Sequence, residues 1–200
     1  MSADDPQRAA LLESTERLLR DQPLSQLTVD QIAVGAGLTR TAFYVYFARK
    51  EDAVAALSER YFAWIFEGRK PFFSDDLPLE ETCRTAIQNE VAIWREHGAV
   101  LRSVVDTATT DAAMRDAWFA QVEQFITPVE ARIVSHAAQR GAPPPHQPRI
   151  AAEALVWMAE RYYYVWSSKG SADAENVVEG LTPVMLAMMT GAPSTGRDLR

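Results

Sequence analysis

The side chains best suited to chemistry in this sequence lie on one face of a short segment around position 40. Phe43 and Phe47 are spaced four apart, so they face the interior of a helix and leave the other positions outside. The outer residues, which include a guanidinium, a hydroxyl and a phenol, are Arg40, Thr41, Tyr44 and Val45. Groups of this kind can enter a major groove and bind base edges. The pattern therefore favours binding to DNA.

Two short helices are expected to position these groups. Thr28 and Gln31 form a capping-box pattern, and Thr39 can cap the helix that follows. Gly37 lies between them, where a left-handed C-terminal cap requires glycine. Two helices of this length have the dimensions of a helix-turn-helix, whose second helix lies in the major groove.

The spacing of apolar residues predicts helices along the whole chain and no strand, so the expected fold class is all-α, with about nine helices. We expect an N-terminal helix-turn-helix domain of three helices (residues 1–50), a C-terminal helical domain (51–192) and a tail (193–200). Pro128 and Pro183 are expected to kink or shorten two helices. The expected helices lie near 6–21, 28–37, 39–47, 50–68, 79–97, 99–106, 111–140, 148–168 and 173–190.

Composition restricts the class of protein. The net charge of −7 argues against a nucleic-acid partner, but residues 1–50 hold six basic and six acidic residues, so the acidic excess lies after position 50. Cys83 is the single cysteine, and neither a secretory signal pattern nor a long apolar run is present. We therefore expect a cytoplasmic protein that does not associate with membranes.

The residues that could support catalysis are isolated from one another. His97, His136 and His146 lack a second ligand at helical spacing, so no metal site is expected. Cys83 lacks an evident base, and no glycine-rich phosphate loop occurs. The sequence predicts no enzyme activity and no cofactor.

The second half is rich in aromatic residues. Met114, Trp118, Phe125 and Val129 share one face of an expected helix. This stripe either packs in an ordinary core or lines a narrow apolar channel, and both interpretations remain open.

Two charged residues, Glu160 and Arg161, interrupt an otherwise apolar helix. Buried charges are normally paired. We expect Arg161 either to form an ion pair with Glu90 or to orient a ligand.

The N-terminal pattern resembles the TetR family of bacterial transcriptional regulators over about fifty residues. The resemblance rests on residues 27–33, on 36–47 and on the pair 50–51, which together hold the glycine, the aromatic core and a following Lys-Glu. By position, the resemblance implies that Thr28 and Thr39 contact phosphates. It implies that the residues facing bases are Arg40, Thr41, Ala42 and Val45, and that those holding the DNA backbone are Tyr44, Tyr46 and Lys50.

Two positions in this motif leave alternatives. Tyr46 can instead pack in the core beside Phe43. Arg49 replaces the small capping residue that many members carry there, so it is expected to change the cap of the next helix and to add a phosphate contact.

The second half resembles a family member that has a long aromatic-lined cavity. The matching residues are the segments 83–87, 140–143 and 158–161, the last followed by aromatics, together with Trp118 and Phe125. Val156 and Ala159 replace two cavity asparagines and Cys83 replaces an aromatic, so the ligand of that relative is not carried over. The expected residues of an apolar effector site are Trp94, Trp118, Phe125, Trp157, Met158, Arg161, Tyr164 and Met185.

Members of the family pair through their last two helices, and this implies a homodimer. The expected interface residues are Ile150, Ala154, Val177, Leu181 and Val184. The predicted function is a dimeric repressor that binds palindromic double-stranded operator DNA and is released by an apolar small molecule. The alternative is a helical module that binds a ligand or a partner and whose DNA function is altered.

Overall fold

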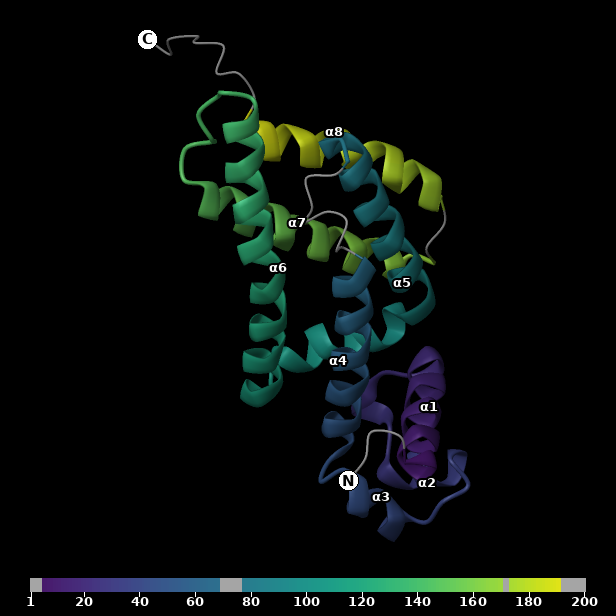
Figure 1. Cartoon of the computed structure of the whole chain (residues 1–200). Helices are drawn as coiled ribbons and strands as arrows, with labels where there is room; N and C mark the ends of the chain where they lie inside the picture. The colour runs from purple at the N-terminus through teal and green to yellow at the C-terminus, as the bar shows by residue number, and fades with distance from the viewer. Residues whose placement is uncertain (1–4, 69–76, 171–172, 192–200) are drawn as a thin grey trace. The chain divides into compact units, whose positions relative to one another are not determined.

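Every regular element in the described residues is a helix, which confirms the expected all-α class. The computed structural model describes residues 5–68, 77–170 and 173–191, so the expected tail at 193–200 lies outside the described residues. Eight α-helices and one 3-10 helix occur within these ranges, and no strand does (Figure 1). The elements are α1 (Pro6–Asp21), η1 (Leu24–Gln26), α2 (Val29–Gly35), α3 (Arg40–Tyr46), α4 (Lys50–Gly68), α5 (Leu79–Ala108), α6 (Ala112–Gln139), α7 (Pro148–Ser168) and α8 (Ala174–Thr190).

Helix α5 takes the place of two expected helices. It continues through Gly98, where the sequence predicted a break. That expectation was wrong because a glycine inside a helix costs only about 1 kcal/mol relative to alanine. Val100, Leu101 and Val104, directly after the glycine, are buried, and their packing keeps the segment helical.

Both internal prolines lie inside continuous helices. Helix α6 passes through Pro128 and α8 passes through Pro183, so neither proline ends its helix. An interior proline costs about 3 kcal/mol through its lost hydrogen bond and its steric clash. In α6 the buried Phe125, Val129 and Ile133 lie on both sides of the proline, and their burial offsets that cost.

The first three helices pack around a small apolar core and are joined by polar contacts. Ser14 Oγ of α1 donates to Ile32 O at 2.8 Å, and Arg17 Nη2 donates to Gly35 O at 2.9 Å. A Cβ at Gly35 would collide with Ser14 and Arg17, so α1 and α2 approach this closely only because position 35 is glycine. The buried apolar residues of this core include Leu11, Ile32, Ala33 and Phe43.

The chain divides into two compact units. The first comprises residues 1–64 and 93–121, and the second comprises 65–92 and 122–200. The first unit holds α1 to α3, most of α4, the second half of α5 and the start of α6. In the second unit α7 and α8 lie against each other (Figure 1).

A half-buried carboxylate connects three helices of the first unit. Glu16 of α1 lies 2.7 Å from His97 Nδ1 of α5 and 3.5 Å from Arg60 Nη2 of α4. The ring of Tyr61 stacks on the His97 imidazole at 4.2 Å between centroids, and Tyr61 is fully buried. The cluster therefore fixes α1 against α4 and α5 through one charged side chain.

Replacing this carboxylate is expected to destabilise the first unit. Burial by itself raises the pKa of Glu16, but hydrogen bonds from Tyr61 and His97 outweigh it and hold the pKa below its ordinary value of 4.5. A lowered folded-state pKa means that the stabilisation is present above pH 4.5 and is lost as the pH falls through the lower value. Glu16→Gln is expected to reduce the free energy of unfolding at pH 7 by about 1–3 kcal/mol, measured by urea titration.

The control is Glu13→Gln, on an exposed position of the same helix. The difference between Glu16→Gln and the wild type is expected to shrink below pH 4.5. If the difference in free energy of unfolding stays constant down to pH 3, the charge of Glu16 does not contribute to the stability.

Candidate nucleic-acid interface and apolar pocket

Helices α2 and α3 begin with the caps that the sequence predicts. Thr28 Oγ1 accepts from Gln31 N at 3.2 Å, while Gln31 Oε1 accepts from Thr28 N at 2.8 Å, which completes a capping box. Thr39 Oγ1 accepts from Ala42 N at 3.2 Å. Both threonines are exposed, so their hydroxyls lie at the surface where the two helices begin.

The turn between the helices is closed by the backbone. Leu38 N donates to Ala33 O at 2.8 Å and Gly37 N donates to Val34 O at 3.0 Å, the hydrogen bonds of a Schellman motif. Gly37 has φ +69°, a conformation that favours glycine. This turn fixes the direction in which α3 leaves α2.

Helix α3 has a buried face and an exposed face. Phe43 and Phe47 are buried, and Phe47 packs against Phe43 with 5.6 Å between ring centroids. Thr41 and Val45 are exposed, as are Arg40 and Tyr44. Val34 on α2 is 76% exposed, which marks it as a further apolar residue at this surface.

Arg40 is held by two side chains in this structure. Its Nη1 lies 3.0 Å from Asp30 Oδ2, and its Nη2 donates to Tyr44 OH at 3.2 Å. All three side chains are exposed. The guanidinium is therefore positioned at the surface by groups that water or another anion can replace.

Two of the expected backbone-binding residues have partners in the protein. Lys50 Nζ donates to Leu24 O and to Leu27 O, at 2.7 Å each, and so fixes η1 to the start of α4. Tyr46 is half-buried, and its hydroxyl donates to Asp5 Oδ2 at 2.9 Å. Both residues have a structural role here, and their contacts with phosphate stay a prediction.

Arg49 lies where α4 begins and has no side-chain acceptor for capping. Asp52 fulfils that need, because its Oδ2 accepts from Arg49 N at 2.9 Å. The Arg49 guanidinium reaches Asp111 Oδ2 at 2.8 Å. Asp111 also caps α6 through Met114 N, and this hydrogen bond and Arg49 lower the pKa of its carboxyl.

Sequence reasoning missed the acidic partners of two arginines and one tyrosine. Arg40, Tyr46 and Arg49 contact aspartates that lie 10, 41 and 62 residues away in sequence, and no short spacing identifies them. Asp52 lies three residues after Arg49, and this short spacing could have predicted its contact with the Arg49 backbone.

The expected effector residues fall in both units of the chain. In the first unit Trp94 and Trp118 are buried, and Phe62 contacts Trp118 edge to face at 5.2 Å between ring centroids. In the second unit Phe125 is buried and lies 5.9 Å from Phe66. The other expected members in the second unit are Met185, which is buried, and Trp157, Met158 and Tyr164, which are partly exposed.

The two charged residues of α7 lie in different environments, one exposed and one buried. Arg161 is 58% exposed and lies beside Glu160 Oε2 at 3.8 Å and over the Tyr164 ring at 4.7 Å, so it does not form the expected ion pair with Glu90. Glu160 is the buried member, with 8% of its side chain exposed, because the two neighbouring positions lie on different sides of the helix. Burial raises the pKa of Glu160, and Arg161 opposes that rise.

Cys83 is buried in the second unit. Its Sγ lies 3.8 Å from Met189 Sδ, and burial raises the pKa of its thiol to about 12. Val156 and Ala159, the other two positions that differ from the cavity of the relative, are also buried.

The expected dimer residues differ in exposure within a single chain. Val177 and Leu181 are buried, 4% and 7% exposed, so they pack inside their own protomer. Ile150, Ala154 and Val184 are exposed. Helical periodicity did not separate these two sets because both are apolar.

Two pockets among the described residues are lined by side chains outside the expected sites. One has a volume of about 350 Å³ and involves Leu24, Glu51 and Asp106. The other, of about 300 Å³, lies at the ends of α6 and α8. Within the same residues, no three His, Cys, Asp or Glu side chains group as metal ligands, and no helix is both long and apolar enough to cross a bilayer.

Comparison with known proteins assigns both parts of the chain. Residues 11–57 match the family of bacterial regulatory proteins of the tetR type, and residues 83–191 match the C-terminal domain of the transcriptional regulator EthR. The HTH-type transcriptional regulator EthR of Mycobacterium tuberculosis is 30% identical over 160 residues, covering 78% of this chain and 74% of the relative. EthR of Mycolicibacterium smegmatis is 25% identical over 197 residues, covering 96% and 90%.

Solved structures share the fold at low sequence identity. A TetR-family regulator from Rhodococcus superposes with a TM-score of 0.79 at 15% identity, covering 93% of this chain and 100% of the other. AibR, solved with isovaleryl coenzyme A and operator DNA, gives 0.69 at 20% identity, covering 90% and 97%. FadR of Bacillus subtilis, solved with stearoyl-CoA, gives 0.73 at 13% identity, covering 92% and 98%.

The capped helix-turn-helix, the all-helical C-terminal half and the relatives agree with one another. The chain belongs to the TetR family of bacterial transcriptional regulators, and its C-terminal domain is of the EthR type.

Proposed function

We propose that this regulator is a dimeric cytoplasmic repressor that binds a palindromic operator through α3 and leaves it when an apolar small molecule binds the C-terminal helices. The observation that carries the proposal is the exposed face of α3, where Arg40, Thr41, Tyr44 and Val45 lie between two capped helices. A short helix presented in this way fits the major groove.

In the proposed complex the Arg40 guanidinium leaves its ion pair with Asp30 and donates hydrogen bonds to a guanine. The ion pair with Asp30 is exposed, so breaking it costs little compared with a two-point contact to a base. Thr28 and Thr39 are placed to bind phosphates, and Tyr44, which holds Arg40, binds the backbone.

Arg49, Lys50 and Tyr46 are proposed to contribute secondary phosphate contacts. Arg49 must share its guanidinium with Asp111, and Lys50 must share its ammonium with two carbonyls. Because the first fifty residues are electrically balanced, few counterions are released on binding, and affinity depends on placed contacts more than on a broad positive field.

The proposed effector is apolar and elongated, and its binding is opposed to that of DNA. FadR of Bacillus subtilis was solved with stearoyl-CoA, which carries a long apolar acyl chain, and AibR with isovaleryl coenzyme A, whose acyl group is short and branched. Phe125 and Met185 of the second unit are buried and apolar, a chemistry that suits contact with an acyl chain. Helix α4 runs without a break from Lys50 to Gly68, so a shift of its C-terminal end moves its N-terminal end beside α3. Ligand and operator then weaken each other's binding by the same factor.

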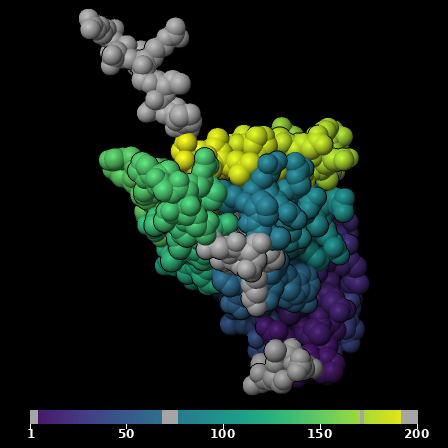
Figure 2. Space-filling model, turned by 45° about the horizontal axis from the view of Figure 1, so that its top comes forward, coloured from purple at the N-terminus to yellow at the C-terminus, as the bar shows by residue number. Residues whose placement is uncertain are grey.

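The proposed dimer forms through the exposed face of α7 and α8. Ile150, Val165 and Val184 are apolar and exposed there, and a Cβ at Gly180 would meet open space. Figure 2 shows α8, in yellow, at the surface along much of its length. Small and apolar residues on two adjacent helices suit a four-helix interface with a second copy.

A second candidate is a helical module that binds a ligand or partner and no longer binds an operator. The pairing of Arg40 with Asp30 and of Arg49 with Asp111 favours it, because these acids neutralise the surface. The exposed polar face of α3 favours the repressor.

Operator binding is tested by fluorescence anisotropy against a pool of palindromic duplexes at fixed salt. The wild type is expected to bind selectively, and Arg40→Ala and Tyr44→Ala are expected to weaken selective binding roughly 5- to 150-fold, because each removes a placed contact. Arg115→Ala is the control, since Arg115 is exposed on α6 and pairs only with Asp116 among the described residues. Weak binding of equal strength in all four proteins would favour the second candidate.

Removing the acid that holds Arg40 is expected to strengthen DNA binding. Asp30→Asn frees the guanidinium and deletes a negative charge at the interface, so affinity is expected to rise about two- to fivefold at low salt. The matched control is Asp116→Asn, an exposed aspartate whose loss changes the net charge equally. A lower affinity in Asp30→Asn would mean that Asp30 orients Arg40 for its contact.

The dimer face is tested by analytical ultracentrifugation at micromolar protein. Val184→Glu places a charge in the proposed interface and is expected to give monomers, while the wild type sediments as a dimer. Val134→Glu is the control, because Val134 is an equally exposed apolar residue on α6. A dimeric Val184→Glu protein would contradict this interface.

A further inference from the structure

The pocket at the ends of α6 and α8 differs in chemistry from the proposed effector site. Its volume of about 300 Å³ lies at the lower end of the range for small-molecule sites, roughly 300–1,000 Å³. It is lined by His136, Ala137, Arg140, Ala142, Pro143, Met189, Thr190 and Gly191, all within the second unit. None of these eight residues is an expected effector residue.

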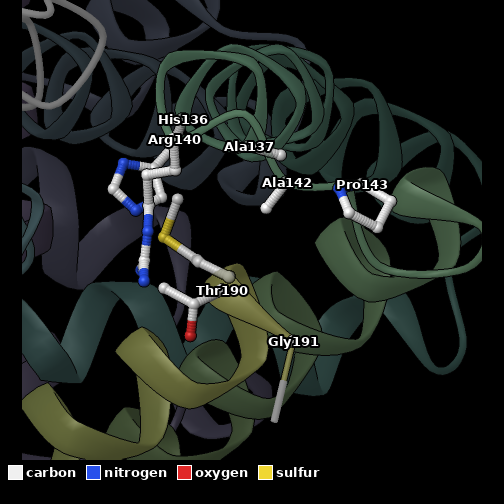
Figure 3. A pocket seen from close by; sticks show the side chains of 8 residues that line it. His136, Ala137, Arg140, Ala142, Pro143, Thr190 and Gly191 are labelled. Carbon is white, nitrogen blue, oxygen red and sulfur yellow. The ribbon is translucent and has the colours of Figure 1, made fainter. Parts of the chain in front are cut away.

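The polar groups of the pocket lie on one side and the apolar groups on the other. Figure 3 shows the Arg140 side chain, just after the end of α6, extending toward Thr190 at the end of α8, with the His136 ring beside it and with Ala142 and Pro143 on the other side of the view. No carboxylate is among these lining residues, although the chain as a whole has a net charge of −7. The pocket therefore combines a local positive charge with an apolar wall.

Arg140 is not needed to cap α6. Ala142 N donates to Ala137 O at 3.0 Å and Gly141 N donates to Ala138 O at 3.1 Å, so the backbone itself satisfies the last carbonyls. The Arg140 backbone N–H donates to His136 O at 3.3 Å and to Ala137 O at 3.2 Å, while its guanidinium makes no hydrogen bond or ion pair with the described residues. A guanidinium in this position can form a two-point contact with an oxyanion.

The other lining residues restrict the chemical groups that such an anion can place in the pocket. Thr190 Oγ1 donates its proton to Leu186 O at 2.8 Å, so this hydroxyl does not offer a donor to an anion. Arg140 is then the residue that places the charged group. The buried Met189 and the neighbouring Ala137 offer contact to methylene groups.

We propose that this pocket binds a small amphipathic oxyanion, a short-chain carboxylate or monoalkyl phosphate, whose charged group pairs with Arg140 and whose alkyl chain packs on Met189 and Pro143. The site lies apart from the residues of the proposed effector site. Its occupancy is measured directly on the protein without DNA, so the proposal stands or fails independently of operator binding.

The experiment is isothermal titration calorimetry of the full chain with four probes: hexanoate, hexyl phosphate, inorganic phosphate and hexylammonium. Saturable binding of hexanoate or hexyl phosphate is expected, with none for hexylammonium because its charge is reversed. Butyrate is expected to bind more weakly than hexanoate by roughly fourfold for each buried methylene removed. Inorganic phosphate that binds as tightly as hexyl phosphate would overturn the role of the apolar wall.

Variants then locate the site. Arg140→Gln is expected to weaken binding at least about tenfold, because a charge-assisted hydrogen bond is lost. Arg115 is an exposed arginine on α6, and Arg115→Gln is expected to bind like the wild type. Ala142→Phe, which fills the pocket without changing charge, is expected to weaken binding as well. No saturable binding to the wild type, or undiminished binding in Arg140→Gln, would overturn the proposal.

Discussion

The half-buried carboxylate of Glu16 ties the helix that supports the helix-turn-helix to the rest of the first unit. Glu16 is on α1, which also contacts α2 through Ser14 and Arg17. The same helix is fixed to α4 and α5 through Arg60 and His97. A charge at this position is stable only while its hydrogen-bond partners surround it, since an unpaired buried carboxylate is costly. The orientation of α3 therefore depends on polar contacts of defined geometry. Such contacts resist the sliding of one helix along another more than an apolar interface does.

The two arginines that we propose to face DNA are paired with acids in this structure. Arg40 pairs with Asp30 and Arg49 pairs with Asp111. In the proposed complex a phosphate or base must replace the aspartate before the arginine is bound, so we expect the surface to attract DNA weakly at a distance and to discriminate between sequences at contact. This arrangement agrees with a chain whose excess charge is acidic, because specificity is then separated from general attraction to nucleic acid.

Local patterns predicted the parts of the fold that depend on neighbours in sequence. The caps at Thr28 and Thr39 and the turn at Gly37 follow from residues within four positions of one another. Contacts between residues far apart in sequence, such as that of Arg49 with Asp111, could not be predicted from residue spacing. The continuity of α5 depended on packing around Gly98. Periodicity also failed to separate the buried Val177 from the exposed Val184, because both positions hold the same apolar residue.

The one cysteine of the chain is shielded from reagents in solution. Cys83 is fully buried, and burial raises the pKa of its thiol. Peroxide and disulfide reagents attack an accessible thiolate, so we expect Cys83 to react slowly with them in the folded protein. The same property makes the native chain a ready background for spectroscopic labels, because a cysteine introduced at an exposed position would react while Cys83 stays silent.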